Sequence, residues 1–213
     1  MASGKVNLRK EWKHLYSPSA RKISVVEVPP MHFLMVDGTG DPNTSPAYRQ
    51  AMEALFSLSY TLKFKSKKEA GMDYVVMPLE SLWWTDDPAQ FDVEHKDLWQ
   101  WTAMMMQPET VTAAAFEEAR AEVRRKKELP ALDRVRFERY HEGLSVQIMH
   151  IGPYDAEGPT IARLHRFIEE NGYEPNGKHH EIYLSDPRRT APEKLKTVLR
   201  QPVRKKPQSE AKS

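Results

Sequence analysis

Apolar and polar residues alternate in two pairs of segments, one pair in each half of the chain. In the first half, ISVVEV (23–28) and MHFLMVDGTG (31–40) have the two-residue period typical of β-strands, and two prolines separate them. In the second half, RVRFERY (134–140) and LSVQIMHIG (144–152) have the same pattern around Glu142 and Gly143. Each half is therefore predicted to begin with two strands.

A helix follows in each half. The segment AYRQAMEALFSLSYTLKF (47–64) has an apolar residue every three or four positions, and Ser45 and Pro46 precede it as N-cap and first-turn residue. The segment GPTIARLHRFIEENG (158–172) is predicted to be the matching helix, closed by Gly172. An alanine-rich, charged helix between the halves, with Thr110 or Thr112 as its cap, is predicted to connect them.

Two further strands complete each half. They are predicted at 73–84 and 98–108 in the first half, and at 179–187 and 195–203 in the second, with Gln-Pro ending the last strand of both. We therefore predict an α+β fold of duplicated strand-helix-strand-strand repeats with pseudo-twofold symmetry. Because each helix covers one face of its sheet, a ligand cleft is expected between the two antiparallel sheets.

These segments define the expected domain organisation. Residues 1–203 are predicted to form a single domain. Its parts are repeat one at about 22–108, the connecting helix at about 109–129 and repeat two at about 134–203. Residues 204–213 are basic and polar, a composition that predicts a disordered tail.

Composition excludes several classes of function. Lysines and arginines number 32 against 30 acidic residues, and much of the excess lies in the tail, so neither nucleic acid nor an anionic membrane is expected as partner. The chain has no cysteine, which excludes disulfides and thiolate chemistry. No apolar run approaches the roughly 20 residues of a membrane span, and the first residues have no signal-like apolar core, so we expect a cytoplasmic protein.

Glu181 stands in the middle of the strand HHEIYL. Alternation places Glu181 and Tyr183 on one face, and Ile182 and Leu184 on the other. If the first face meets water, Glu181 is an ordinary strand carboxylate, paired with Lys178 or Arg188. If the face lines a cleft, Glu181 is a charge available to a ligand or a reaction.

Aromatic and sulfur-containing residues near this strand are the other pocket candidates. Four tryptophans lie around the predicted strands of repeat one, and we select Trp84 and Trp101 as a wall for a flat ligand, with the protein core as the alternative for each. Met105 is assigned to the pocket or to a buried strand, and Tyr154 to the end of the cleft or to a turn. The adjacent His179 and His180 point to opposite faces of a strand, so we expect no metal and no cofactor.

Several long motifs occur in one order and spacing. They are VDGTGDPN, YVVMPLESLWW, QWTAMMMQPETVT, MHIGPYDAEGPTIARLH, HHEIYLSDPRR and LKTVLRQPV. In these motifs, over about Leu8 to Val203, the chain resembles the stand-alone GyrI-like proteins, which are related to effector domains of multidrug-sensing regulators. No helix-turn-helix segment precedes them, so a DNA-binding regulator is not expected.

The resemblance implies a ligand site. In regulators of this family an acidic residue on the strand corresponding to HHEIYL faces the drug pocket, and Glu181 matches it. The resemblance also makes Glu80 a pocket candidate, with a salt bridge at the rim as its alternative. Stand-alone members include cyclopropanoid cyclopropyl hydrolases, which open the strained ring of DNA-alkylating compounds with water.

We accordingly expect a detoxifying hydrolase for cyclopropanoid genotoxins. Partial desolvation would raise the pKa of Glu181 and make it the general base, and Tyr183 would orient the water. A protein that only binds drug-like amphipathic or cationic molecules is the alternative. The expected partner is a flat aromatic small molecule, and the expected state is a monomer or weak dimer.

Overall fold

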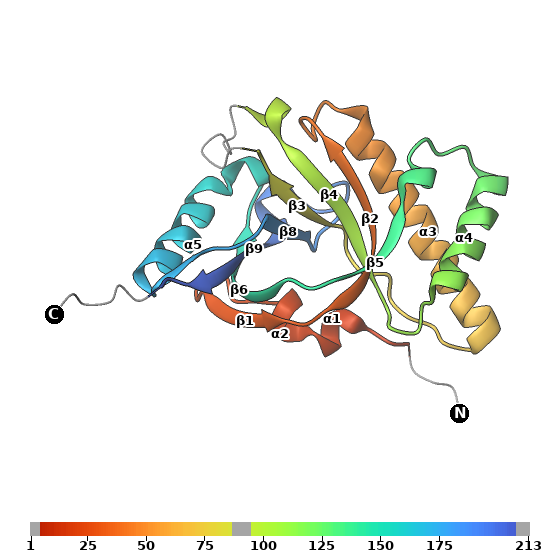
Figure 1. Ribbon diagram of the computed structural model, residues 1–213, viewed down its shortest axis with the longest axis horizontal. Coiled ribbons are helices and arrows are strands. Elements are labelled where there is room, and N and C mark those ends of the chain that lie inside the picture. Colours follow the sequence, from red (N-terminus) through yellow and green to blue (C-terminus); the bar gives the residue numbers. More distant parts are fainter. Residues whose placement is uncertain (1–4, 87–94, 208–213) are drawn as a thin grey trace.

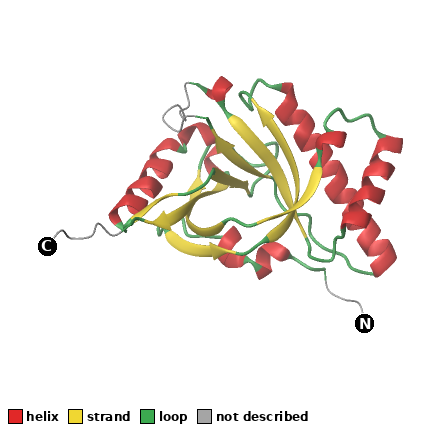
Figure 2. Ribbon diagram, viewed as in Figure 1, coloured by secondary structure: helices red, strands yellow, loops and turns green. Residues whose placement is uncertain are grey.

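The computed structural model describes residues 5–86 and 95–207 and has the predicted α+β class (Figures 1 and 2). Its strands form one antiparallel sheet. They are β1 (Ser24–Val28), β2 (Met31–Thr39), β3 (Glu80–Trp84), β4 (Gln100–Gln107), β5 (Arg136–Tyr140), β6 (Gly143–Ile151), β7 (Tyr173–Pro175), β8 (His179–Tyr183) and β9 (Lys196–Lys205).

The strand order mixes the two halves of the chain. It is β1-β6-β9-β8-β3-β4-β2-β5, with β7 also paired to β9. Strand β1 pairs with β6 of the second half, and β5 pairs with β2 of the first. The first strand of each half, β1 or β5, is therefore an edge strand that pairs with a strand of the other half.

The two halves meet where β3 pairs with β8. Ser81 lies opposite Glu181, and Leu82 lies opposite His180. The expected pair of separate sheets is thus one continuous sheet, and the expected cleft between sheets is not the arrangement found. Both β3 and β8 would otherwise be edge strands with unpaired backbone groups, and their pairing satisfies those groups.

Two long helices cover the same face of this sheet at its two ends. Helix α3 (Pro46–Ala70) packs on β2 and β4, and α5 (Gly158–Glu170) packs on β6 and β7 (Figure 1). Helix α3 ends at Gly71, whose φ of 66° is the left-handed conformation that glycine adopts freely. We call this face of the sheet the helix face.

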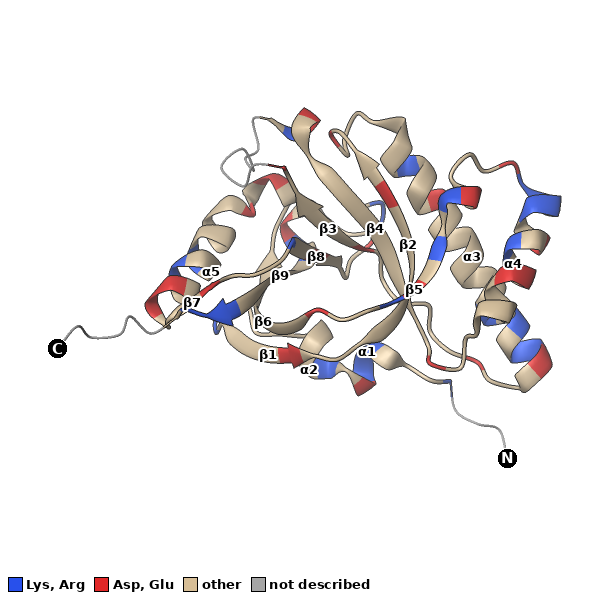
Figure 3. Ribbon diagram, viewed as in Figure 1, with Lys and Arg blue, Asp and Glu red and all other residues tan. Residues whose placement is uncertain are grey.

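The predicted connecting helix is α4 (Ala113–Lys126), which packs on α3. Thr112 is its N-cap, and the Thr112 hydroxyl accepts a hydrogen bond from the backbone of Ala115. Charged residues occur along its length (Figure 3). No helix of residues 5–86 and 95–207 is both long and apolar enough to cross a bilayer.

Two short helices that the pattern did not predict cover the opposite face of the sheet. Helices α1 (Leu8–Glu11) and α2 (Lys13–Tyr16) bury Leu8, Leu15 and Tyr16 against side chains of the central strands. At the other terminus β9 continues to Lys205, so residues 204 and 205 belong to the sheet and not to a tail. Residues 208–213 lie outside the described part of the chain.

Single turns of 3-10 helix complete the fold. They are η2 (Lys96–Leu98), η3 (Leu132–Arg134), η4 (Tyr154–Ala156) and η5 (Pro192–Lys194). Of these, η4 leads directly into α5 at the edge of the helix face. It thereby brings Tyr154 and Glu157 to the central strands, as described below.

Candidate functional site

Strand β8 presents different chemistry to the two faces of the sheet. Its alternation directs Glu181 and Tyr183 to the helix face, between the regions covered by α3 and α5. His180 and Ile182 point to the opposite face, where α1 and α2 lie. His179 lies with Glu181, so the two adjacent histidines do point to opposite faces.

The Glu181 carboxylate accepts hydrogen bonds on both of its oxygens. The hydroxyl of Tyr183 donates to Oε2 at 2.7 Å, and Nε2 of His179 lies 3.2 Å from Oε1. The indole of Trp83 in turn donates to the Tyr183 hydroxyl at 3.1 Å. The Glu181 side chain remains 13% exposed.

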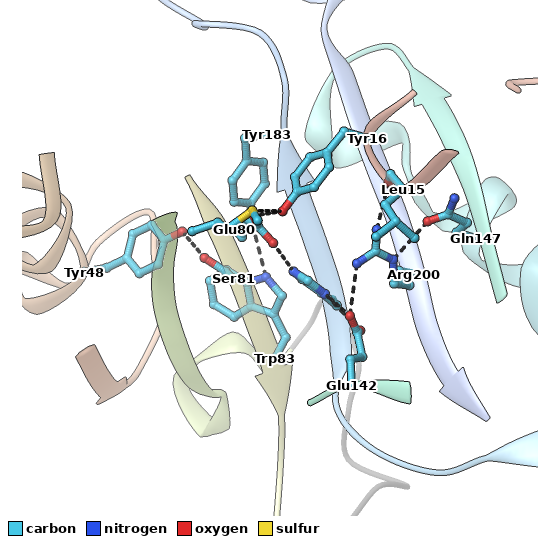
Figure 4. Close-up of polar contacts among 12 residues, drawn as sticks. Leu15, Tyr16, Tyr48, Glu80, Ser81, Trp83, Glu142, Gln147, Tyr183 and Arg200 are labelled. Carbon is cyan, nitrogen blue, oxygen red and sulfur yellow. Dashed lines mark hydrogen bonds and ion pairs between the residues drawn. The ribbon is translucent and has the colours of Figure 1, made fainter. Parts of the chain in front are cut away.

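Aromatic side chains from both ends of the sheet surround this carboxylate. Tyr48 of α3 shares a 2.7 Å hydrogen bond with Ser81, the residue opposite Glu181 in the β3–β8 register (Figure 4). The ring of Tyr48 lies 5.4 Å from that of Trp83. The ring of Tyr154 meets Tyr183 edge to face at 5.6 Å and is itself 40% exposed. Two helices and two central strands therefore build one cluster.

A second carboxyl group belongs to this cluster. Glu157 precedes α5 and is 5% exposed, and within the described residues its Oε1 has no hydrogen-bond partner. The side chain of Thr197, which lies opposite Tyr183 in the β8–β9 register, is close enough to Glu157 to lower the pKa of Glu157. Burial and the negative charge of Glu181 raise the pKa of Glu157 to about 9. Glu157 is therefore protonated at neutral pH.

Glu181 titrates in the opposite direction. Burial alone would raise its pKa, but the hydrogen bonds from His179 and Tyr183 outweigh burial and hold the pKa below its ordinary value. The expected upward shift at Glu181 is thus wrong, because two donors stabilise the charged form. Burial and the neighbouring carboxylate raise the pKa of Tyr183, which stays a protonated donor. The site combines a carboxylate, a neutral carboxylic acid and a phenol.

The opposite face holds a separate buried network (Figure 4). His180 lies 2.9 Å from Glu80 through Nε2 and 2.9 Å from Glu142 through Nδ1. Tyr16 donates to Glu80 at 2.7 Å, and Arg200 donates to Glu142 at 3.0 Å. Burial lowers the pKa of His180, but the two carboxylates outweigh it and raise the pKa to about 9. The imidazole is therefore charged, and the network fastens the N-terminal helices to the sheet.

The structure distributes the seven candidate residues over three places. Glu181, Tyr183 and Tyr154 come together in the cluster on the helix face. Trp101 and Met105 also point to this face, but both are fully buried in the core beneath α3. Their side chains fill the space between sheet and helix.

Glu80 and Trp84 are corrections, because the alternation of β3 directs them away from the cluster. Glu80 is buried in the network with His180. The ring of Trp84 packs on the opposite face, with the ammonium of Lys178 3.3 Å from its centre. The neighbour Trp83 takes the place expected of Trp84.

Three members of the cluster were not among the candidates: Trp83, Tyr48 and Glu157. Alternation along β3 places Trp83 and Trp84 on opposite faces, but only the pairing of Ser81 with Glu181 tells which of them shares a face with the carboxylate. Glu157 and Tyr48 carry no local signal, because tertiary packing brings them to β8. The described residues include no group of three or more acidic or histidine side chains placed to hold a metal ion.

Comparison with known proteins gives a consistent family. Residues 21–204 match the GyrI-like small molecule binding domain. The chain is similar to an uncharacterized conserved protein from Listeria innocua, at 42% identity and TM-score 0.87, over 94% of this chain and all of that one. It is also similar to a hydrolase from Listeria innocua, at 41% identity and TM-score 0.82, with the same coverage.

A more distant likeness concerns the fold alone. The C-terminal domain of EcmrR is similar at 13% identity and TM-score 0.53, over 86% of this chain and 98% of that one. No curated protein matches the sequence significantly.

Proposed function

This chain belongs to the GyrI-like family of small-molecule-binding proteins, and on that premise we propose that it is a hydrolase that adds water to the cyclopropane ring of cyclopropanoid genotoxins. Such a reaction would detoxify compounds that alkylate DNA. The likeness to a Listeria hydrolase at 41% identity supports an enzymatic role. The observation that carries the proposal is the geometry of Glu181, whose carboxylate accepts a 2.7 Å hydrogen bond from Tyr183 and whose side chain is 13% exposed.

The substrate class needs little beyond a positioned water and two proton transfers. Water attacks a methylene carbon of the ring, the strained carbon–carbon bond breaks, and its electron pair aromatises the conjugated dienone to a phenolate. Glu181 accepts the proton that the attacking water loses. A carboxylate with a lowered pKa is a weaker base than one with a raised pKa. The lowered pKa of Glu181 favours the ionised form, which can accept a proton, at neutral pH.

Glu157 is suited to the complementary step. As a neutral acid beside Glu181, it can give its proton to the dienone oxygen as the phenolate forms, so the product leaves as a phenol. Glu181 is then protonated and Glu157 charged. Return of the proton from Glu181 to Glu157 restores the starting state, and the net reaction consumes one water.

Mass spectrometry of a duocarmycin-type cyclopropanoid incubated with the protein tests the proposal. We expect product one water heavier than substrate, and a loss of roughly 10²–10⁴-fold in rate with Glu181→Gln. Glu170→Gln, at an exposed position on α5, is the matched control and should retain full activity. Unchanged substrate with wild-type protein, or an unimpaired Glu181→Gln, would contradict the proposal.

The second candidate is a protein that binds cationic aromatic molecules without converting them. It is favoured by the combination of the Glu181 carboxylate, whose pKa is held below its ordinary value, with the rings of Trp83, Tyr48 and Tyr154. Calorimetric titration with a cationic dye separates the two functions. Binding that depends on Glu181, without any hydration of the cyclopropanoid, would establish the second function in place of the first.

A further inference from the structure

Helix α3 carries a stripe of exposed aromatic residues on the side turned away from the sheet. Phe56, Tyr60 and Phe64 are 38%, 47% and 61% exposed, and the rings of Tyr60 and Phe64 stack at 6.4 Å. They are spaced four residues apart, so they lie on one face of the helix. Single exposed apolar residues are common, but three large rings in line are typical of an interaction surface.

Charged residues of opposite sign stand at the two ends of this stripe. At 100° per residue, Glu53 and Lys67 fall within the same arc of about 80° as the three aromatic residues. Glu53 is exposed and has no ion pair within the described residues. The Lys67 side chain is 60% exposed, and its ammonium lies 3.5 Å from the Asp73 carboxylate of the same chain. We call these five residues, Glu53, Phe56, Tyr60, Phe64 and Lys67, the α3 stripe.

The α3 stripe is complementary to itself. If two copies of α3 pack antiparallel about a twofold axis at Tyr60, each residue meets the one equally far on the other side of position 60. Phe56 then meets Phe64 of the second copy, and Glu53 meets Lys67. An isologous contact requires this reciprocal matching of one patch with itself.

We propose that the α3 stripe is a homodimer interface in which two copies of this chain pack their α3 helices antiparallel, with Tyr60 on the twofold axis. Helix α4 borders the stripe without covering it, since Ser57 and Lys65 on the adjoining side of α3 contact Lys127 and Glu118 of α4. The aromatic rings supply the apolar contact, and the two Glu53–Lys67 pairs fix its direction and register. The interface is independent of the helix-face cluster and of any reaction there.

Charge exchange tests the pairing. Sedimentation velocity over a concentration series should show a monomer–dimer equilibrium for the wild-type chain. Glu53→Lys alone and Lys67→Glu alone should each shift it toward monomer, because like charges then meet at both ends. The double exchange should restore dimerisation, because the charges again complement each other.

A cysteine at the axis gives a second, independent test. The chain has no cysteine of its own, so Tyr60→Cys introduces a single thiol, which a short bismaleimide should link to its symmetry mate as a covalent dimer. Glu170→Cys on α5 is the control and should not link. A wild-type chain that stays monomeric at every concentration, equal linking at positions 60 and 170, or a double exchange that behaves like the single ones would overturn the proposal.

Discussion

Oη of Tyr183 donates a 2.7 Å hydrogen bond to Oε2 of Glu181, although the two residues lie on the same strand only two positions apart. This bond stabilises the charged form of the carboxylate and, with His179, reverses the effect of burial on its pKa. Glu157 and Glu181 are two neighbouring carboxyl groups that share one proton at neutral pH, and the raised pKa of Glu157 places this proton on Glu157. The division between a base and an acid follows from which carboxyl group has donors.

Removal of the Tyr183 hydroxyl should change the pH dependence of the proposed reaction. With Tyr183→Phe the carboxylate loses a donor, so the pKa of Glu181 rises and the acidic limb of the kcat/KM profile moves to higher pH. Above that limb, activity should recover in part, because phenylalanine keeps the ring that packs on Tyr154. An acidic limb at the wild-type pH would show that this hydrogen bond does not control Glu181.

Replacement of Glu157 should increase stability at alkaline pH. The folded-state pKa of about 9 lies above the ordinary value of 4.5, so the contribution of this group to stability is fully present below pH 4.5 and is lost as pH rises through 9. Glu157→Gln is neutral at every pH. Calorimetry should therefore show a higher Tm than wild type at pH 8 and little difference at pH 4, whereas Glu170→Gln should change neither.

Trp83 and Trp84 form a matched pair for ligand binding. Trp83 donates to Tyr183 on the helix face, whereas Trp84 lies on the opposite face of β3. Trp83→Phe should weaken binding and remove most of the quenching that an aromatic ligand causes in tryptophan fluorescence. Trp84→Phe should leave the affinity and the quenching near the wild-type values. Equal effects of the two substitutions would place the ligand elsewhere.

Local pattern was sufficient for the elements of this fold but not for their assembly. The period of the apolar residues gives α3, α5 and the central strands, although β3 begins at Glu80 and not at 73 as predicted. Of the two expected caps of α4, Thr110 and Thr112, the structure uses Thr112. Period cannot tell that β1 pairs with the other half, or that β3 and β8 join two predicted sheets into one. Those pairings depend on contacts between residues more than 50 positions apart.

The same limit applies to the site. Alternation puts Glu181 and Tyr183 on one face of a strand, and the structure agrees. The β3–β8 register was needed to choose Trp83 in place of Trp84, and the hydrogen-bond donors were needed to give the direction of the pKa shift of Glu181. Glu157 could not be found without knowing that the start of α5 lies near Glu181 of β8 and Thr197 of β9.

Removal of His180 should destabilise the fold from the face opposite the site. This imidazolium is 1% exposed and bridges the buried carboxylates of Glu80 and Glu142. His180→Gln removes the cation between them and leaves Glu142 with Arg200 alone. Loss of one partner in a buried ionic network costs roughly 3–5 kcal/mol of unfolding free energy. Urea denaturation measures this loss, with His141→Gln as a control at a histidine that is 59% exposed.

The pH dependence identifies the network as the cause of that loss. The pKa of His180 is raised from 6.5 to about 9, so its contribution is fully present below pH 6.5 and disappears as pH rises through 9. Glu142 titrates at the acidic end of the range. Burial alone would raise its pKa, but the charges of His180 and Arg200 outweigh burial and lower the pKa to about 2. The contribution of Glu142 to stability is therefore lost as pH falls from 4.5 toward 2. The difference in unfolding free energy between wild type and His180→Gln should therefore be largest between pH 4.5 and 6.5 and smaller at pH 9.5. A difference that does not vary with pH would mean that His180 acts by packing alone and not as a buried cation.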